Sequence, residues 1–337
     1  MGKKKLNRPD FQSKLTTPYL PQPDLTSQST WGEPLLEGTD TTFRVYFQNL
    51  KGLHLQRTAL DLIFNMESMK ALNVNLFGWA ETNTNWINYN TQMEYQEKTS
   101  TIFEVAKSAF STSEIPSISH YKPGGTAMTI TGMWCGRAST ETGQDPSGMG
   151  RWSFMTLKGR NSMEIVFITT YRVSQVSMPQ HSDCTTYHQE HMMLSKKGHP
   201  SPNPRAQFIA DMIQFIQSHQ SKGREILLMI DANEAVGDSS QGIDSVMCAC
   251  ALYNIMQATH PEIELPVTYN RGTKTIDHML GSQHCLNSTK RARIWPFYND
   301  IQADHRAWTL YIDMDAMLLF GANQSNVATA KNRSFKS

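Results

Sequence analysis

Short blocks of apolar residues run through the middle of the chain, and their spacing predicts alternating strands and helices. Residues 43–50 alternate between apolar and polar and are rich in aromatics, which is typical of a strand. Residues 74–81 and 225–233 are nearly continuous apolar runs that end in polar residues, as buried strands do. Helical spacing of apolar residues predicts helices over Arg57–Leu72, Thr99–Phe110, Arg205–His219 and Ile243–Tyr253.

The strands in the middle of the chain distinguish between sheet architectures. Residues 125–131, 151–159 and 163–173 predict three successive strands without helices between them, and we interpret them as a meander. A doubly wound parallel sheet needs crossover helices, so two facing sheets with helices outside account better for the pattern. We therefore expect an α/β four-layer sandwich of two facing mixed β-sheets flanked by helices. Its last strands are expected at Thr275–Leu280, around Ile294–Phe297 and at Ala307–Ile312.

The two ends of the chain differ in composition from its middle. Residues 1–40 are rich in Pro, Ser, Thr and Gln, and residues 321–337 in Asn, Ser and Lys. We expect both ends to be flexible and residues 41–320 to form one domain. The formal net charge is +1, so any contact with nucleic acid requires a local basic surface rather than overall charge.

The cysteines and the N-terminus bear on the compartment. Five cysteines at irregular spacing do not suggest a disulfide framework, which favours a reducing compartment. The basic N-terminus lacks the apolar stretch of a secretory signal, and no apolar run approaches the roughly 20 residues that span a bilayer. We expect a nuclear or cytoplasmic protein that is neither secreted nor bound to a membrane. Residues 181–191 contain three histidines and a cysteine, but Thr186 with Gln189 suggests a helix start, and this interpretation is favoured over structural zinc.

Polar and acidic residues recur where the apolar strands end or begin. Strand ends at one edge of a sheet sandwich can converge on a single site. A set of Asp, Glu, Asn, Tyr and His without a reactive Ser or Cys suggests hydrolysis by a metal ion and an activated water. A hard cation neutralises a phosphate, a carboxylate activates the water, and a histidine held by a second carboxylate donates a hydrogen bond. The residues are Asn49, Glu81, Tyr171, Asp231, Asn233, Asp277, Asp304 and His305.

Six short blocks follow one another along the chain: QNLKG (48–52), WAET (79–82), TYR (170–172), IDANE (230–234), TIDHML (275–280) and ADHRAW (303–308). In this order they resemble the signature of the endonuclease/exonuclease/phosphatase superfamily, which includes deoxyribonuclease I, abasic-site endonucleases and endonuclease domains of non-LTR retrotransposons. The resemblance implies a DNase I-like fold and a Mg²⁺-dependent phosphodiesterase, with Mn²⁺ as a substitute. GGTA (124–127), GRW (150–152) and NPR (203–205) look most like retroelement-type endonucleases, which implies a DNA endonuclease that nicks one strand.

The resemblance also implies a metal site. Glu81 would be the principal Mg²⁺ ligand, Asn49 would support the metal and this carboxylate, and Asp304 would lie beside the metal or its water shell. Abasic-site enzymes carry a metal-binding acid two residues after the asparagine, where this chain has Lys51. A second metal is therefore in doubt.

The remaining implied roles concern the reaction itself. Tyr171 would contact the scissile phosphate, Asp231 would position the attacking water, and Asn233 would stabilise the pentacovalent state. Asp277 would orient His305, which faces the phosphate.

Basic residues supply the predicted nucleic-acid contacts. Arg172 and Arg306 flank site residues and are expected to contact phosphates. Lys290, Arg291 and Arg293 lie beside Trp295 and Phe297 in the sequence, a mixture that suits a phosphate backbone and an unstacked base, although a solvated hairpin explains it equally well.

Two other functions stay open at this point. A phosphomonoesterase or lipid phosphodiesterase would use the same fold, and a catalytically inactive binding module would keep the fold without the chemistry. We favour the DNA endonuclease. We expect it to be a monomer, and in a parent retroelement it would work with a reverse transcriptase.

Overall fold

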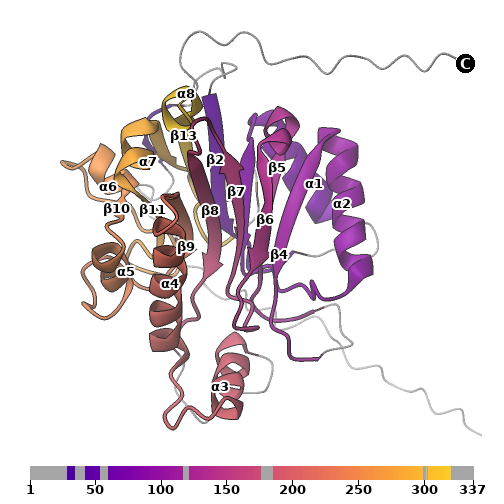
Figure 1. Ribbon diagram of the computed structural model, residues 1–337, viewed down its shortest axis with the longest axis vertical. Coiled ribbons are helices and arrows are strands. Elements are labelled where there is room, and N and C mark those ends of the chain that lie inside the picture. Colours follow the sequence, from indigo (N-terminus) through magenta and orange to yellow (C-terminus); the bar gives the residue numbers. More distant parts are fainter. Residues whose placement is uncertain are drawn as a thin grey trace, which may run out of the picture.

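A computed structural model describes residues 29–34, 42–53, 60–116, 121–175, 185–298, 301 and 303–319 of the 337-residue chain. Its helices are α1 (Leu60–Ala71), α2 (Tyr89–Phe103), α3 (Thr186–Lys196), α4 (Pro204–Gln220), α5 (Ile243–Ala249), α6 (Ile255–Thr259), α7 (Gln283–Ser288) and α8 (Met314–Met317), with a 3₁₀ turn η2 (Gly132–Gly136). Two mixed β-sheets face each other, with α1 and α2 on one outer side and α4 and α5 on the other (Figure 1). The predicted four-layer α/β sandwich is confirmed. Within the described residues, no helix combines the length and apolar character that crossing a membrane demands.

The first sheet has seven strands in the order β1-β12-β13-β2-β3-β5-β4. Their bounds are β1 (Trp31–Gly32), β2 (Thr42–Asn49), β3 (Leu76–Ala80), β4 (Ala106–Ser111), β5 (Thr126–Thr131), β12 (Thr289–Ile294) and β13 (Trp308–Asp313). β2 and β3 run parallel, and the other neighbours are antiparallel. β1 lies within residues 1–40, yet it pairs with β12 at the edge of the sheet.

The second sheet has six strands in the order β10-β11-β9-β8-β7-β6. Their bounds are β6 (Ala138–Gln144), β7 (Trp152–Lys158), β8 (Glu164–Tyr171), β9 (Glu225–Asp231), β10 (Tyr253–Asn254) and β11 (Asp277–Gly281). β8 and β9 are parallel, and the other pairs are antiparallel. Each sheet thus has one parallel pair whose carboxyl ends share an edge.

The core has three layers because both faces of the central strands are covered. In β2, Phe43, Val45 and Phe47 point between the sheets, whereas Tyr46 points outward to the cluster under α1 and α2. All four are at most 1% exposed. Burying each such side chain contributes about 1.5–3 kcal/mol. The sheets come close at Gly78, where an added Cβ would lie 2.2 Å from Oγ1 of Thr169, so β3 requires glycine here.

The predicted helix Thr99–Phe110 is wrong. Helix α2 ends at Phe103, with Glu104 at φ +63, and Ala106–Ser111 forms β4 at the sheet edge. The apolar residues of this segment fit helical spacing, but pairing with β5 satisfies the backbone of residues 106–111 and outweighs that local preference.

The predicted meander is also wrong in its first member. β5 belongs to the seven-stranded sheet, and the meander consists of β6, β7 and β8 in the other sheet. Strand β6 has the polar sequence ASTETGQ and a register shift against β7, so it lacks a regular apolar pattern. The strand expected around Ile294–Phe297 lies earlier, at β12.

A buried ionic cluster joins the loop before β7 to α4. Nε of Arg151 lies 2.6 Å from Oδ2 of Asp145, and Nη2 lies 2.7 Å from Oδ2 of Asp211. The side chains of Arg151 and Asp145 are fully buried. Burial alone would raise the pKa of the Asp145 carboxyl, but the charge and hydrogen bonds of Arg151 outweigh it and lower that pKa.

The substitution Arg151→Met is expected to lower the free energy of unfolding by about 3–5 kcal/mol, because it leaves Asp145 buried without a countercharge. Urea unfolding followed by tryptophan fluorescence measures the change. The control Lys158→Met, at the exposed end of β7, is expected to change the free energy by less than about 0.5 kcal/mol. A loss below about 1 kcal/mol for Arg151→Met would contradict the structural role of the cluster.

Candidate active site

Strand ends from both sheets meet at one edge of the sandwich. The carboxyl ends of the parallel strands β2, β3, β8 and β9 lie there, together with the starts of the antiparallel strands β11 and β13. In the second sheet, Asp231 pairs in register with Tyr171 on one side and Asp277 on the other. This topology brings together Asn49, Glu81, Tyr171, Asp231, Asp277 and His305 from positions spread over the chain.

Asn49 connects the two sheets at this edge. Its Nδ2 donates hydrogen bonds to Oε2 of Glu81 at 3.0 Å and to Oδ2 of Asp231 at 2.7 Å. Its Oδ1 accepts a hydrogen bond from the backbone N–H of Lys51 at 2.8 Å. Asn49 is fully buried, so its amide holds two carboxylates at a fixed separation.

A buried carboxylate orients the histidine. Oδ2 of Asp277 lies 2.9 Å from Nδ1 of His305, and the backbone N–H of Asp277 donates to the hydroxyl of Thr268. Burial lowers the pKa of His305, but the charges of Asp277 and Asp231 and the hydrogen bond to Asp277 outweigh it, so the net pKa is raised. His305 is therefore a cation at neutral pH, and its Nε2–H is directed away from Asp277.

Burial and the charges of nearby carboxylates raise the pKa values of Glu81, Asp231 and Tyr171. Burial raises the pKa of Glu81, and the charge of Asp304 adds to it. Burial and the charge of Asp277 raise the pKa of Asp231. Burial and the charges of Glu81 and Asp231 raise the pKa of Tyr171, whose hydroxyl is hydrogen-bonded to Glu81 and stays protonated.

The donor set of the site fits a hard divalent cation. Glu81, Asp231, Asp277 and Asp304 all interact electrostatically with His305, so acids outnumber the cations around them. Asp231, Asp277 and His305 each offer one ligand atom within 4.8 Å of the others. Oδ1 of Asp304 is buried and has no hydrogen-bond partner among the described residues. Oxygen atoms for a metal are thus present without rearrangement of the fold.

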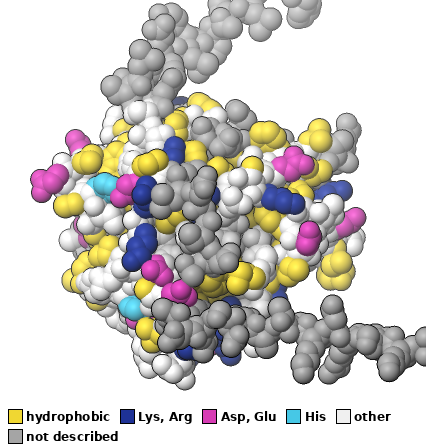
Figure 2. Space-filling model, turned by 90° about the horizontal axis from the view of Figure 1, so that it is seen from above, with side chains coloured by type: hydrophobic (Ala, Val, Ile, Leu, Met, Phe, Trp, Pro, Cys, Tyr) yellow, Lys and Arg dark blue, Asp and Glu magenta, His cyan; other side chains and the backbone are white. Residues whose placement is uncertain are grey.

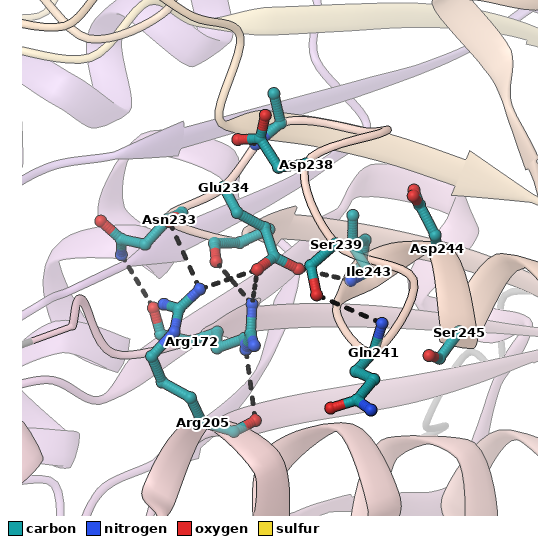
Figure 3. A network of polar contacts seen from close by, with 12 residues as sticks. Arg172, Arg205, Asn233, Glu234, Asp238, Ser239, Gln241, Ile243, Asp244 and Ser245 are labelled. Atoms are coloured by element: carbon teal, nitrogen blue, oxygen red, sulfur yellow. Dashed lines mark hydrogen bonds and ion pairs between the residues drawn. The ribbon is translucent and has the colours of Figure 1, made fainter.

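Two arginines and Glu234 hold the loop that follows Asp231 (Figure 3). Oε2 of Glu234 lies 2.6 Å from Nη1 of Arg172 and 2.9 Å from Nη2 of Arg205, and its Oε1 accepts from the backbone N–H of Ile243. Asn233 is fixed between them at φ +50, with Nδ2 donating to the backbone oxygen of Arg172 at 2.8 Å. Nη2 of Arg205 also donates to the backbone oxygen of Asn233, so the clamp formed by Arg172, Arg205 and Glu234 holds the backbone on both sides of this side chain.

The predicted nucleic-acid contacts divide into two groups. Arg172 and Arg306 are 4% and 1% exposed, and Arg306 donates to the backbone oxygens of Trp295 and Ser29. Both side chains are committed to contacts within the protein, so the structure does not present them on the surface.

The basic residues Lys290, Arg291 and Arg293 follow one another along β12, the neighbour of the edge strand β1. Arg291 donates to the backbone oxygen of Pro34, and the Arg293 guanidinium lies 4.0 Å from the ring of Trp295. Lys290 pairs with Asp313, the N-cap of α8, at the end of β13 opposite to His305. Figure 2 views that end of the molecule, where basic and acidic side chains are scattered among hydrophobic ones. The run does not form one patch beside the site.

The sequence assigned no contact to three polar residues that lie near the site. Lys51 has its Nζ 2.7 Å from Oδ2 of Asp304, so this acid is tied to a cation. Glu234 and Arg205 form the clamp. All three stand inside the quoted blocks QNLKG, IDANE and NPR, so the signal was present, but their pairing depends on contacts between distant segments.

Comparisons with known proteins address the fold. No protein-family model and no curated protein matches this sequence. The AP endonuclease LMAP from Leishmania major matches in structure with a TM-score of 0.60 and 14% identity, over 84% of this chain and 93% of that one. The 3′ phosphatase NExo from Neisseria, bound to a product DNA hairpin, matches with a TM-score of 0.53 and 14% identity, over 80% and 99%. The catalytic domain of human Nocturnin matches with a TM-score of 0.53 and 12% identity, over 87% and 98%.

These likenesses extend over most of each chain and include both sheets. At such low identities they establish the arrangement of the backbone and leave the activity to be argued from the site. The fold implied by the six sequence blocks is confirmed: the chain has a DNase I-like fold.

Proposed function

We propose that this protein is a metal-dependent phosphodiesterase that acts as a DNA endonuclease, with Mg²⁺ as its metal and Mn²⁺ as a substitute. The observation that carries the proposal is the convergence of Glu81, Asp231, Asp277 and His305 at one edge of a DNase I-like sandwich. This set contains a base, a cationic hydrogen-bond donor and oxygen ligands, which together suit attack of water on a phosphodiester.

Each residue of the site has a separate role in the proposed reaction. Glu81 and Asp304 would hold a divalent cation, which would supply positive charge to the phosphate and the leaving oxygen. Asp231, with its raised pKa, accepts a proton from the attacking water. His305, oriented by Asp277, donates a hydrogen bond from Nε2 to a phosphate oxygen as negative charge builds there. The water oxygen forms a bond to phosphorus as the bond between phosphorus and O3′ breaks, which leaves a 5′-phosphate and a 3′-oxygen that takes a proton from solvent to become a 3′-hydroxyl.

Tyr171 and Asn233 complete the polar lining. The protonated hydroxyl of Tyr171 is bonded to Glu81, so it sets the direction of that carboxylate and stays next to the phosphate position. Asn233 is oriented by the clamp of Arg172, Arg205 and Glu234, and we propose that it donates to the pentacovalent phosphorus group. Arg172 acts in this proposal as a positioning residue.

The retroelement type is part of the proposal and is supported by the sequence runs GGTA, GRW and NPR. In that role the 3′-hydroxyl left by the nick primes synthesis by a reverse transcriptase of the parent element. We propose that the protein works as a monomer, in the nucleus or the cytoplasm.

Nicking of supercoiled plasmid tests the activity and the site together. The wild type is expected to nick with Mg²⁺ or Mn²⁺ and to be inactive with EDTA. Asp231→Asn and His305→Asn are each expected to lower the rate by about 10²–10⁴-fold, because each removes a proton-transfer or hydrogen-bonding group from the reaction. Gel electrophoresis over time measures the rate.

Two matched substitutions serve as controls for this experiment. Asp315→Asn on α8, at the far end of the molecule, and His199→Asn after α3, where His199 is exposed, are expected to leave nicking unchanged. If the folded wild type nicks the plasmid with neither Mg²⁺ nor Mn²⁺, the endonuclease proposal is wrong. Release of phosphate from phosphomonoesters or lipids would then favour another hydrolase, and no turnover at all would favour a binding module.

The role of Arg172 can be separated from phosphate contact by salt dependence. Arg172→Met is expected to lower the nicking rate at least about tenfold, equal to about 1.4 kcal/mol, because Asn233 loses its clamp. The slope of log binding constant against log salt is expected to stay unchanged, since a buried arginine neutralises no phosphate. Fluorescence anisotropy with labelled DNA at several salt concentrations measures the slope.

A direct contact between Arg172 and a phosphate would instead change the salt slope of DNA binding. A fall in that slope by about 0.9 would show that Arg172 contacts a phosphate directly. Thermal unfolding of the variant, compared with the wild type, checks that the fold is intact.

A further inference from the structure

A groove of about 440 Å³ lies directly beside the candidate active site. It is lined on one side by the loop after β2 and by α1, and on the other by Asn270, Arg271, Tyr298, Ile301, Ala303 and Asp304. This volume falls within the range of small-ligand sites. The proposed reaction leaves it unused, and we refer to it as the Lys51–Tyr298 groove.

Short links connect both walls of the groove to the site. The backbone N–H of Lys51 donates to Oδ1 of Asn49 at 2.8 Å. On the other wall, the backbone N–H of Asn270 donates to the backbone oxygen of Asp304 at 2.9 Å, and the ring of Tyr269 lies 4.9 Å from the ring of His305. The groove therefore adjoins Asn49, Asp304 and His305 of the candidate site.

Two exposed cationic side chains, Lys51 and Arg271, line the groove. Nζ of Lys51 lies 2.7 Å and Nη2 of Arg271 lies 3.6 Å from Oδ2 of Asp304. Their side chains are 54% and 66% exposed, whereas that of Asp304 is 11% exposed. The acid thus contacts both cations while more than half of each side chain stays exposed, and the two cations exceed the single acid in charge.

Two aromatic rings line the same groove. Phe64 on α1 is 52% exposed and Tyr298 is 51% exposed. The Tyr298 hydroxyl accepts a hydrogen bond from Nδ2 of Asn270, which holds the ring in place. Half-exposed rings offer a face on which a base can stack, provided that the base is not already stacked inside a duplex.

We propose that the Lys51–Tyr298 groove binds an unpaired nucleotide of the strand that is cut, next to the scissile phosphate. Its base stacks on Tyr298 and Phe64, and its phosphate contacts Lys51 and Arg271. The inference rests on the proposed nuclease function and narrows its substrate to DNA with a single-stranded or easily unpaired segment at the cleavage position.

Binding without cleavage tests the groove separately from catalysis. In EDTA, fluorescence anisotropy compares a labelled single strand with a duplex of the same sequence. Tyr298→Ala and Phe64→Ala are each expected to weaken single-strand binding at least about fivefold, the lower end of what a stacked base contributes. Arg271→Ala is expected to lower the salt slope by about 0.7. Duplex binding is expected to change less than single-strand binding in all three variants.

Matched variants separate stacking from damage to the fold. Tyr298→Phe keeps the ring and is expected to retain wild-type affinity. Tyr253→Ala, which removes a 42% exposed ring on β10, and Lys158→Ala, which removes an exposed cation at the end of β7, are expected to have no effect on binding.

The outcomes distinguish the two proposals. A wild type that nicks plasmid, but whose groove variants bind single strands as the wild type does, overturns the groove and leaves the nuclease. A wild type that does not nick, yet binds single strands through Tyr298 and Arg271, overturns the nuclease and keeps the groove. A wild type that binds no single strand overturns the groove.

Discussion

A single amide nitrogen, on Asn49, donates to carboxylates that come from both sheets, and the geometry of the candidate site depends on this shared donor. Glu81 and Asp231 repel each other in a buried setting, and burial raises the pKa of each. The shared donor offsets part of this cost by giving each carboxylate a hydrogen bond. The protein accepts an unfavourable concentration of acids here, as functional sites often do at the expense of stability.

The general fold could be predicted because buried strands leave a strong mark on the sequence. The apolar runs before Glu81 and Asp231 gave both the strands and the places where they end, and the end of a strand determines where the next polar side chain lies. Strand β6 could not be found in this way, because ASTETGQ lies at a sheet edge with a shifted register. The segment around Val105 fitted a helix locally and became a strand through its partner β5.

The site was harder to predict where function depends on pairing. A basic residue in a sequence carries no sign of whether it will be buried, and Arg172 and Arg306, which we expect from the sequence to contact phosphates, are 4% and 1% exposed. Lys51 was noticed as a departure, but its contact with Asp304 spans more than 250 residues of chain. The arginines of the runs GRW and NPR have structural roles. Arg151 neutralises a buried acid, and Arg205 holds Glu234.

The position of β2 has a consequence for biosynthesis. This strand, from residues 42–49, has β13, from residues 308–313, as one of its two neighbours. The ribosome synthesises β13 long after β2, so β2 lacks one of its two neighbouring strands during most of translation. His305 lies three residues before β13, so a nascent chain carries Glu81, Asp231 and Asp277 well before it carries His305. For a protein with the proposed activity, the site is therefore complete only late in synthesis.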